Sequence, residues 1–241
     1  NLTHYRDNYN TGAASVGNYG ARYAGALGNS LKIQACGGTA AFAATTVTTT
    51  NGTTAILGTS VEVTLGEKFI VGDIITAIGS DAVRYKISAI TFDSGATGAA
   101  TVTIAQEDDS TQGLAVAVSN NSNISREWEH AGLFSKAPGT STYASGRASA
   151  GVTDEIHIVV TDEDGLISGI PGTVLETYEA LSKASDAKDE FGTTNYYVTV
   201  LENKSSYVYW LDHSSTFGSA GSAASGVTFG TGTLPDSLSF T

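Results

Sequence analysis

An acidic turn at residues 162–165, Asp-Glu-Asp-Gly, is the part of the sequence whose residue types could bind a metal ion. Two aspartates separated by one residue begin a calcium loop, which also needs a glycine at its sixth position and a glutamate at its twelfth. Counted from Asp162, the glycine is fourth, and Ile167 and Thr173 occupy the sixth and twelfth positions. Because Asp-Gly pairs are common in hairpin turns, the sequence favours a turn between strands over a calcium site.

The histidines and the single cysteine are the other candidates, and none has the spacing of a zinc or metalloprotease site: His4, His130, His157, His213 and Cys36. His157 lies on a predicted buried strand, which favours a hydrogen-bonded core or interface histidine over a catalytic one. Cys36 is expected to be a small buried apolar residue. Abundant serine and aspartate leave a Ser-His-Asp triad open, but the chain has no Gly-x-Ser-x-Gly elbow, phosphate-binding loop or dinucleotide fingerprint. We therefore predict no catalytic, cofactor-binding or metal-binding residue, and no enzyme.

The composition excludes further classes of function. The 241 residues include 12 basic and 24 acidic ones, for a net charge of −12, which argues against binding nucleic acid or an anionic membrane through a basic face. The aromatic run 207–210 contains no lysine or arginine, so it predicts a packed strand rather than a surface that stacks bases. No apolar run is long enough to span a membrane, and no signal peptide is visible. A chain that begins at Asn1 and contains no methionine is interpreted as a piece of a longer protein.

The elements around the acidic turn can be predicted from their patterns. Alternating apolar residues over 155–161, with Val159 adding apolar surface to the other face, predict a central strand, and a short return strand is expected at 166–167. Thr173 and Glu176 have the spacing of a capping box. Apolar residues at helical spacing follow, with a Glu179–Lys183 pair on the solvent side, so a helix is predicted from Val174, Leu175, Tyr178 and Leu181. Strands are predicted at 196–201 and 207–211, joined by a turn at 202–205.

The rest of the chain suggests an interrupted core. Leu31, Ile33 and Ala35 alternate as a strand, and Leu238 and Phe240 begin another. Residues 37–60 indicate a linker or weak strands, and 124–134 could be a strand. Between them every pattern favours short strands, as in a small sandwich or barrel: 61–65, 69–76, 83–92, 100–105 and 114–118. We predict a β-rich α+β protein, with a discontinuous core domain at 1–41 and 125–241 and an inserted all-β domain at 42–124.

The stretch 154–212 resembles the tail sheath proteins of contractile-tailed bacteriophages, the T-even type in particular. The resemblance lies in an ordered series of motifs: Asp-Glu-x-His-x-Val-Val-x-Asp-Glu-Asp-Gly, Gly-x-Pro-Gly-Thr-Val-Leu-Glu, Ser-Lys-Ala, Tyr-Tyr, and Ser-Tyr-Val-Tyr-Trp. Two further segments are similar to sheath sequences, Ala-Pro-Gly-Thr-Ser at 137–141 and a segment that shares Gly25, Gly28, Asn29 and Leu31. The order and spacing of these pieces carry the resemblance.

The resemblance implies a structural and mechanical function. Sheath subunits form six-fold rings around the tail tube, and a signal from the baseplate triggers a contraction that drives the tube through the host envelope. It implies an α/β sheath core with outer domains inserted into it, and terminal arms that add strands to neighbouring sheets. The expected partners are other sheath subunits, the tail tube protein and the baseplate, with no cofactor, and the expected location is the virion, after assembly in the host cytoplasm.

Two expectations qualify this function. The chain is interpreted as a fragment that lacks the C-terminal part of a sheath protein, so it is expected to be monomeric on its own. The alternative functions are a β-rich phage adhesin or decoration protein, which the strands of 61–118 alone would permit, and a hydrolase with an unrecognised triad.

Overall fold

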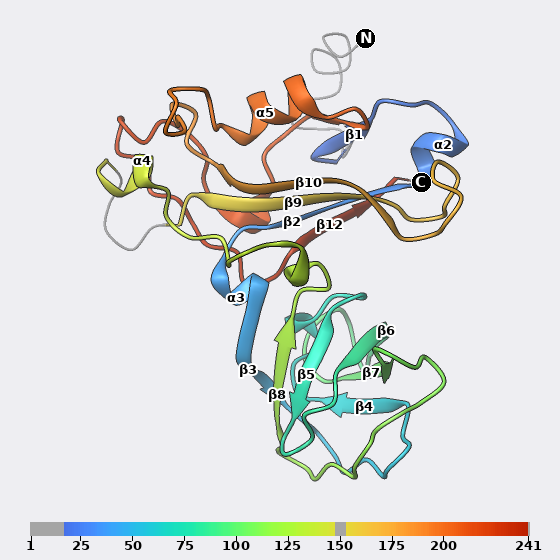
Figure 1. Ribbon diagram of the computed structural model, residues 1–241. Helices are drawn as coiled ribbons and strands as arrows, with labels where there is room; N and C mark the ends of the chain where they lie inside the picture. Colours follow the sequence, from blue (N-terminus) through green and yellow to red (C-terminus); the bar gives the residue numbers. More distant parts are fainter. Residues whose placement is uncertain (1–16, 148–152, 241) are drawn as a thin grey trace. The chain divides into compact units, whose positions relative to one another are not determined.

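The computed structural model describes residues 17–147 and 153–240 (Figure 1). The chain divides into two compact units: unit 1 comprises residues 1–38 and 138–241, and unit 2 comprises residues 39–137. Strands make up 36% and helices 13% of the described residues, and the strands form several antiparallel sheets. The protein is therefore β-rich and consistent with the predicted α+β class. In the described residues, no helix is long and apolar enough to cross a membrane.

Unit 1 is built on a four-stranded antiparallel sheet around the strand β9 (Glu155–Asp162). The strand order is β10–β9–β2–β12, with β10 at Thr173–Ser182, β2 at Leu31–Cys36 and β12 at Asp236–Ser239. All residues of β9 are buried, as expected for a central strand with apolar residues on both faces. The strands predicted for the β2, β9 and β12 segments are confirmed.

The helix predicted from Thr173 onward is wrong, because this segment is the strand β10. It pairs with β9 from Thr173 opposite Asp162 to Ser182 opposite Glu155, with two bulges along the way. The return strand predicted at 166–167 is also wrong, since these residues belong to the turn between β9 and β10. Valine, threonine and tyrosine favour strands, and pairing with a buried neighbour outweighs the local capping-box spacing.

The strand predicted at 196–201 is wrong as well, because these residues begin the helix α5 (Tyr197–Lys204). The turn predicted at 202–205 instead forms the end of this helix. Tyr197, Val198 and Leu201 are buried at helical spacing and belong to the apolar cluster of the sheet. The helix α5 covers one face of this sheet (Figure 1). Burial against the sheet overrides the β propensity of a tyrosine- and valine-rich run.

Short elements complete unit 1. The strand β1 (Tyr19–Ala21) pairs antiparallel with β11 (Val208–Trp210), which confirms the strand predicted at 207–211. Tyr19 and Val208 belong to the same core cluster as the sheet, so this ribbon is packed onto it. The remaining helical pieces are α2 (Ala26–Asn29), α4 (Thr142–Ser145) and the 3-10 turn η3 (Ser215–Phe217).

Unit 2 is a six-stranded antiparallel barrel with strand order β3–β8–β5–β6–β7–β4. The barrel closes between β3 and β4, because the backbone N–H of Thr64 donates to Thr49 at 3.0 Å and that of Asn51 donates to Glu62 at 2.8 Å. Alternate side chains fill its interior with a second apolar cluster, separate from that of unit 1. Its elements are α3 (Thr39–Phe42), β3 (Ala43–Thr49), β4 (Ser60–Val63), η1 (Gly66–Lys68), β5 (Ile74–Ile78), β6 (Tyr85–Phe92), β7 (Ala100–Gln106), β8 (Asn123–Glu127) and η2 (Ala131–Leu133).

The boundaries of unit 2 differ from those expected for the inserted domain. The predicted domain 42–124 lies within unit 2, which extends to 39–137. The difference arises at β8, which pairs with β3 and β5 and so keeps residues after 124 in the barrel. The expected strand at 114–118 is a loop with a single bridge from Val118 to Thr54.

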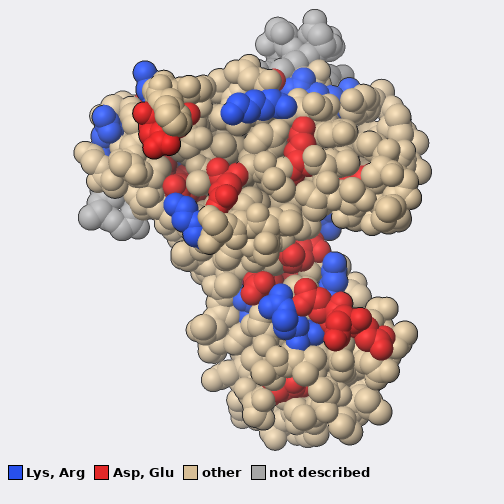
Figure 2. Space-filling model, viewed as in Figure 1, with Lys and Arg blue, Asp and Glu red and all other residues tan. Residues whose placement is uncertain are grey.

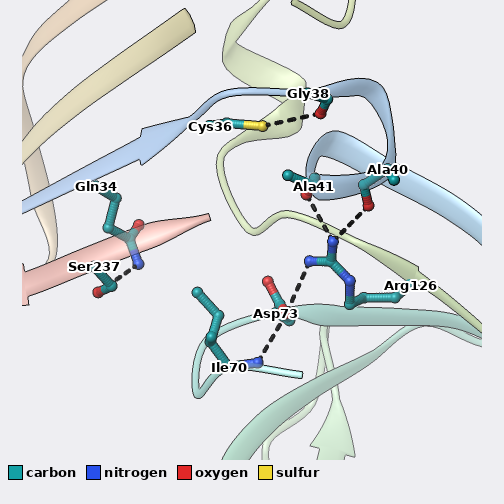
Figure 3. Close-up of polar contacts among 9 residues, drawn as sticks. All are labelled: Gln34, Cys36, Gly38, Ala40, Ala41, Ile70, Asp73, Arg126 and Ser237. Carbon is teal, nitrogen blue, oxygen red and sulfur yellow. Dashed lines mark hydrogen bonds and ion pairs between the residues drawn. The ribbon is translucent and has the colours of Figure 1, made fainter. Parts of the chain in front are cut away.

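A buried ion pair fastens the first turn of unit 2 to its barrel (Figure 3). Arg126 of β8 donates to Asp73 at 2.9 Å, and both side chains are fully buried. Its second terminal nitrogen donates to the carbonyl oxygens of Ala40 and Ala41 in α3, each at 2.8 Å. Burial of Asp73 outweighs the attraction of Arg126 and raises the pKa of that carboxyl to about 6. The pair thus links β8 to α3 and to the residue that precedes β5. Removing either partner would leave the other charge buried without a counter-charge.

Deleting unit 2 is expected to leave unit 1 folded. Each unit has its own apolar cluster, and the strands of each sheet come from one unit only. A chain in which a short Gly/Ser linker replaces residues 39–137 should therefore retain a cooperative thermal transition, followed by circular dichroism and Trp210 fluorescence. A broad, non-cooperative transition would contradict this independence.

Candidate functional site around the acidic turn

The buried carboxylate of Asp162 accepts hydrogen bonds that hold the acidic turn in place. It accepts hydrogen bonds from the Ser30 hydroxyl at 2.5 Å, the Ser168 hydroxyl at 2.7 Å, and the backbone N–H groups of Ile167 (2.9 Å) and Ser168 (2.6 Å). Asp162 itself is fully buried at the end of β9. Ser30 precedes β2, so the carboxylate joins the turn to the neighbouring strand as well as to its own hairpin.

These contacts leave the Asp162 carboxylate without free oxygen lone pairs for a metal ion. Burial alone would raise the pKa of Asp162, but the four donors outweigh it and hold that pKa well below its usual range. The same donors occupy the lone pairs that a cation would need. Among the described residues, no group of three or more His, Cys, Asp or Glu side chains is placed to hold a metal ion. The turn is a structural anchor that fixes the hairpin tip.

A second buried carboxylate, Asp154, holds the start of β9. It accepts from the backbone N–H of Ser141 at 2.7 Å, from the Ser141 hydroxyl at 2.8 Å, and from the Ser182 hydroxyl. Because both hydroxyl protons point to Asp154, neither serine can give its proton to a histidine, as a catalytic nucleophile must. The segment Ala-Pro-Gly-Thr-Ser at 137–141 thus ends in an anchor on the sheet.

Of the candidate histidines and the cysteine, Cys36 and His157 lie opposite each other as cross-strand partners on β2 and β9, and the other described candidates lie elsewhere. His157 is buried on β9, and its Nδ1 accepts from the backbone N–H of Ala180 at 3.0 Å, where β10 bulges with a positive φ of 51°. Cys36 is buried on β2, with its Sγ 3.6 Å from the carbonyl oxygen of Gly38 (Figure 3). His130 lies in unit 2, edge-on to the ring of Trp128. His4 lies outside the described residues.

Lys183 is a buried lysine whose environment the sequence did not predict. Instead of pairing with Glu179 in solvent, it is 1% exposed, and its Nζ donates to the carbonyl oxygens of Phe217 (3.0 Å) and Gly230 (2.5 Å). Burial lowers the pKa of Lys183 to about 8, against the opposing attraction of Asp154. The ammonium therefore holds Phe217 and Gly230 together, two residues far apart in the segment that links β11 to β12.

The stability of unit 1 is expected to rise between about pH 8 and pH 10, by up to about 2 kcal/mol. The pKa of Lys183 is lower in the folded chain than in the unfolded one, so the unfolded chain binds more protons in this window. Urea unfolding at a series of pH values measures the slope. Lys183→Met should remove it, whereas Lys188→Met, which changes an exposed lysine nearby, should keep it. A stability that falls with pH across this window in the wild type would contradict the argument.

An aromatic cluster lies where α5, β11 and the following turn meet, and no sequence motif pointed to it. The Tyr197 hydroxyl is 2.5 Å from Nδ1 of His213 and accepts from the indole N–H of Trp210 at 3.2 Å. Since the hydroxyl accepts from the indole, its own proton is available to His213 Nδ1, which favours a neutral ring protonated on Nε2. Burial likewise lowers the pKa of His213. The cluster is a packed hydrogen-bonded network of Tyr197, Trp210 and His213.

The sheet of unit 1 ends, in the described part of the chain, at β12. The backbone N–H of Phe240 donates to Leu31 at 3.0 Å, so by alternation the N–H groups of Ser237 and Ser239 point away from β2. An outer strand of this kind can pair with a further strand.

Comparisons with protein-family models, with curated proteins and with solved structures give no match for this chain.

Proposed function

We propose that this chain is a structural protomer of a bacteriophage contractile tail sheath, which assembles around the tail tube and contracts to drive it through the host envelope. The observation that carries the proposal is where the sheath-like motifs lie. The residues of 154–212 form β9, β10, α5 and β11, which together make most of the core of unit 1. Motifs that specify a core in their order and spacing support a shared fold better than motifs scattered over surface loops.

The architecture supports the same proposal in two further ways. A sheath protomer needs rigid bodies that keep their shape while they move, and the anchors at Asp154 and Asp162 fix both ends of the central strand. It also needs to join neighbours through added strands, for which the outer edge of β12 is suited. The partners in this proposal are other sheath subunits, the tube protein and the baseplate, within the virion after assembly in the host cytoplasm.

The proposal is tested by assembly. Protein expressed from the whole gene that contains these residues is expected to form tubes with six-fold end views in negative-stain micrographs. The 241-residue chain alone is expected to sediment as a monomer at micromolar concentration, because a net charge of −12 adds repulsion between copies. Particles without tubes, combined with specific binding to glycans or to phage heads, would instead favour the adhesin or decoration function.

A further inference from the structure

The dipeptide Asn51-Gly52 lies where the barrel of unit 2 closes, just after the end of β3. Asparagine is one of the thermally labile residues of proteins, because the backbone nitrogen of the next residue can displace the ammonia of its side chain. The displacement is easiest before a small residue, and glycine, which has no β-carbon, hinders it least. The chain contains one Asn-Gly pair and two Asn-Ser pairs, Asn29-Ser30 and Asn121-Ser122.

Both groups that would react are free at Asn51. The residue is exposed, and no described residue forms a hydrogen bond with its side-chain amide. The backbone N–H of Gly52 also has no acceptor in the part of the chain that the structure describes. Attack by this nitrogen closes a five-membered ring, so the two groups react without having to meet by diffusion.

The two Asn-Ser pairs are held differently. The backbone N–H of Ser30 donates to the carbonyl oxygen of Ala26 at 3.0 Å. The backbone N–H of Ser122 donates to the Thr50 hydroxyl at 2.9 Å. A nitrogen in a hydrogen bond must first lose its acceptor before it can turn toward the amide. The structure therefore distinguishes Asn51 from the asparagines of the other two pairs.

The carboxylate of Glu62 lies against Gly52. Its Oε2 is 3.0 Å from the position that a β-carbon at residue 52 would take. The backbone N–H of Asn51 donates to the carbonyl oxygen of Glu62 at 2.8 Å, which is one of the hydrogen bonds that close the barrel. An aspartate at position 51 would therefore place a second carboxylate beside Glu62 at this closure, and like charges on paired segments are destabilising.

The cations of unit 2 that form ion pairs are already engaged elsewhere. On the face of this unit seen in Figure 2, basic side chains lie close to acidic ones. Arg84, Lys86 and Arg126 are each paired with a carboxylate. A new negative charge at position 51 would thus meet Glu62 without recruiting one of these three cations.

We propose that Asn51 is a site of spontaneous deamidation, which weakens the closure of the barrel as the protein ages. The Gly52 nitrogen gives its proton to a base in the solvent and forms a bond to Cγ of Asn51. The bond from Cγ to Nδ2 breaks, and Nδ2 takes a proton and leaves as ammonia. Water then opens the cyclic imide at either carbonyl and yields aspartate or isoaspartate, so the net reaction consumes one water and releases one ammonia.

The test is incubation of the whole chain at about 37 °C, at about pH 7 and about pH 9, followed by peptide mapping with mass spectrometry. The peptide that contains Asn51 is expected to gain about 1 Da, whereas those with Asn29 and Asn121 should keep their mass. Because the attacking nitrogen must lose its proton, the rate at Asn51 should rise roughly tenfold per pH unit. Similar rates at all three asparagines would overturn the proposal. An Asn51 that stays intact while the peptide Thr-Thr-Asn-Gly-Thr is deamidated under the same conditions would overturn it too.

Gly52→Ala tests the attacking group. It should slow the reaction at Asn51 by at least about tenfold, because a β-carbon hinders the nitrogen. The added methyl group would meet only the movable end of the Glu62 side chain, so the fold is expected to survive, and circular dichroism checks this. Gly132→Ala, at a position with open space in the same unit, is the matched control and should leave the rate unchanged. An unchanged rate in folded Gly52→Ala would contradict attack by this nitrogen.

The weaker closure is measured on the product. The deamidated chain, which has one more negative charge, is separated by anion exchange and unfolded in urea, followed by Trp128 fluorescence in a Trp210→Phe background. Its midpoint should lie below that of the unmodified chain, and Asn51→Asp should lower the midpoint as well. Glu62→Gln removes the neighbouring carboxylate, so Asn51→Asp should lower the midpoint less in that background. Equal midpoints of the deamidated and the unmodified chain would overturn the weakened closure.

Discussion

Arg126→Met is expected to lower the free energy of unfolding of unit 2 by about 3–5 kcal/mol, because it leaves a buried aspartate without its counter-charge. Asp73 is fully buried, and in the wild type Arg126 donates to one of its oxygens at 2.9 Å. The substitution also removes the donors to the carbonyl oxygens of Ala40 and Ala41, which frees the first turn of the unit from the barrel. Methionine fills most of the arginine's volume, so the loss reports polar interactions more than a cavity.

The matched control is Arg84→Met, which changes an exposed arginine paired with Glu107 and Glu127. Exposed ion pairs contribute little, so this variant should lose at most about 1 kcal/mol. Urea unfolding followed by Trp128 fluorescence in a Trp210→Phe background reports unit 2 alone, since the chain has two tryptophans. Equal losses in the two arginine variants would show that the buried pair is no more important than a surface pair.

The pH dependence of this loss has a definite sign. The pKa of Asp73 is raised to about 6, so in the folded chain this carboxyl binds its proton more readily than in the unfolded chain. Its contribution to stability is therefore present in acid and is lost as the pH rises through about 6. Without Arg126 the carboxyl should take up a proton more readily still, so Arg126→Met should cost less at about pH 5 than at about pH 8.

Asp162→Ala is expected to lower the free energy of unfolding of unit 1 by about 3 kcal/mol, since each hydrogen bond to a charged carboxylate contributes about 1.5–3 kcal/mol and water replaces part of the loss. The substitution leaves two backbone N–H groups and the hydroxyls of Ser30 and Ser168 without their acceptor. Urea unfolding followed by Trp210 fluorescence measures the loss. Hydrogen exchange should quicken first in the turn 163–172.

Asp164→Ala is the control for this prediction, because Asp164 is an exposed residue of the same turn. It should change the stability by no more than about 0.5 kcal/mol. The pKa of Asp162 is lower in the folded chain, so its carboxylate stabilises the fold above the unfolded pKa, and this contribution is lost as the pH falls through the folded value. The gap between wild type and Asp162→Ala should accordingly narrow below about pH 4, and a gap that widens there would refute the assignment.

Two of the errors in the predicted elements, at β10 and at α5, have a common physical cause. At β10, a capping-box spacing and four apolar residues suggested a helix, but the segment follows a tight turn after a buried strand and completes its hydrogen bonds. At α5, a tyrosine- and valine-rich run suggested a strand, but burial of Tyr197 and Leu201 against the sheet selects the helix. Strands such as β2 and β9 were predictable because their alternation and their burial agree.

The hydrogen-bond partners of the buried Asp162 and Lys183 could not be predicted from the sequence either. That Asp162 belongs to a turn and that His157 is buried could be inferred from their positions in the sequence. The partners Ser30, 132 residues away from Asp162, and Phe217 and Gly230 for Lys183 depend on the tertiary fold, which no local spacing encodes. The aromatic cluster of Tyr197, Trp210 and His213 likewise forms only once α5 and β11 have packed together.

The closed barrel has a consequence for synthesis on the ribosome. The strand β2 pairs with β9, and the paired residues Lys32 and Thr161 lie 129 positions apart, so at ribosomal speeds β2 waits roughly 10 s for its first partner. During that interval all strands of unit 2 emerge, and they find their partners among themselves. A ring without an open edge cannot capture the waiting strand. Unit 2 is thus expected to fold before unit 1, and its strands are not expected to pair with β2 while β2 waits for β9.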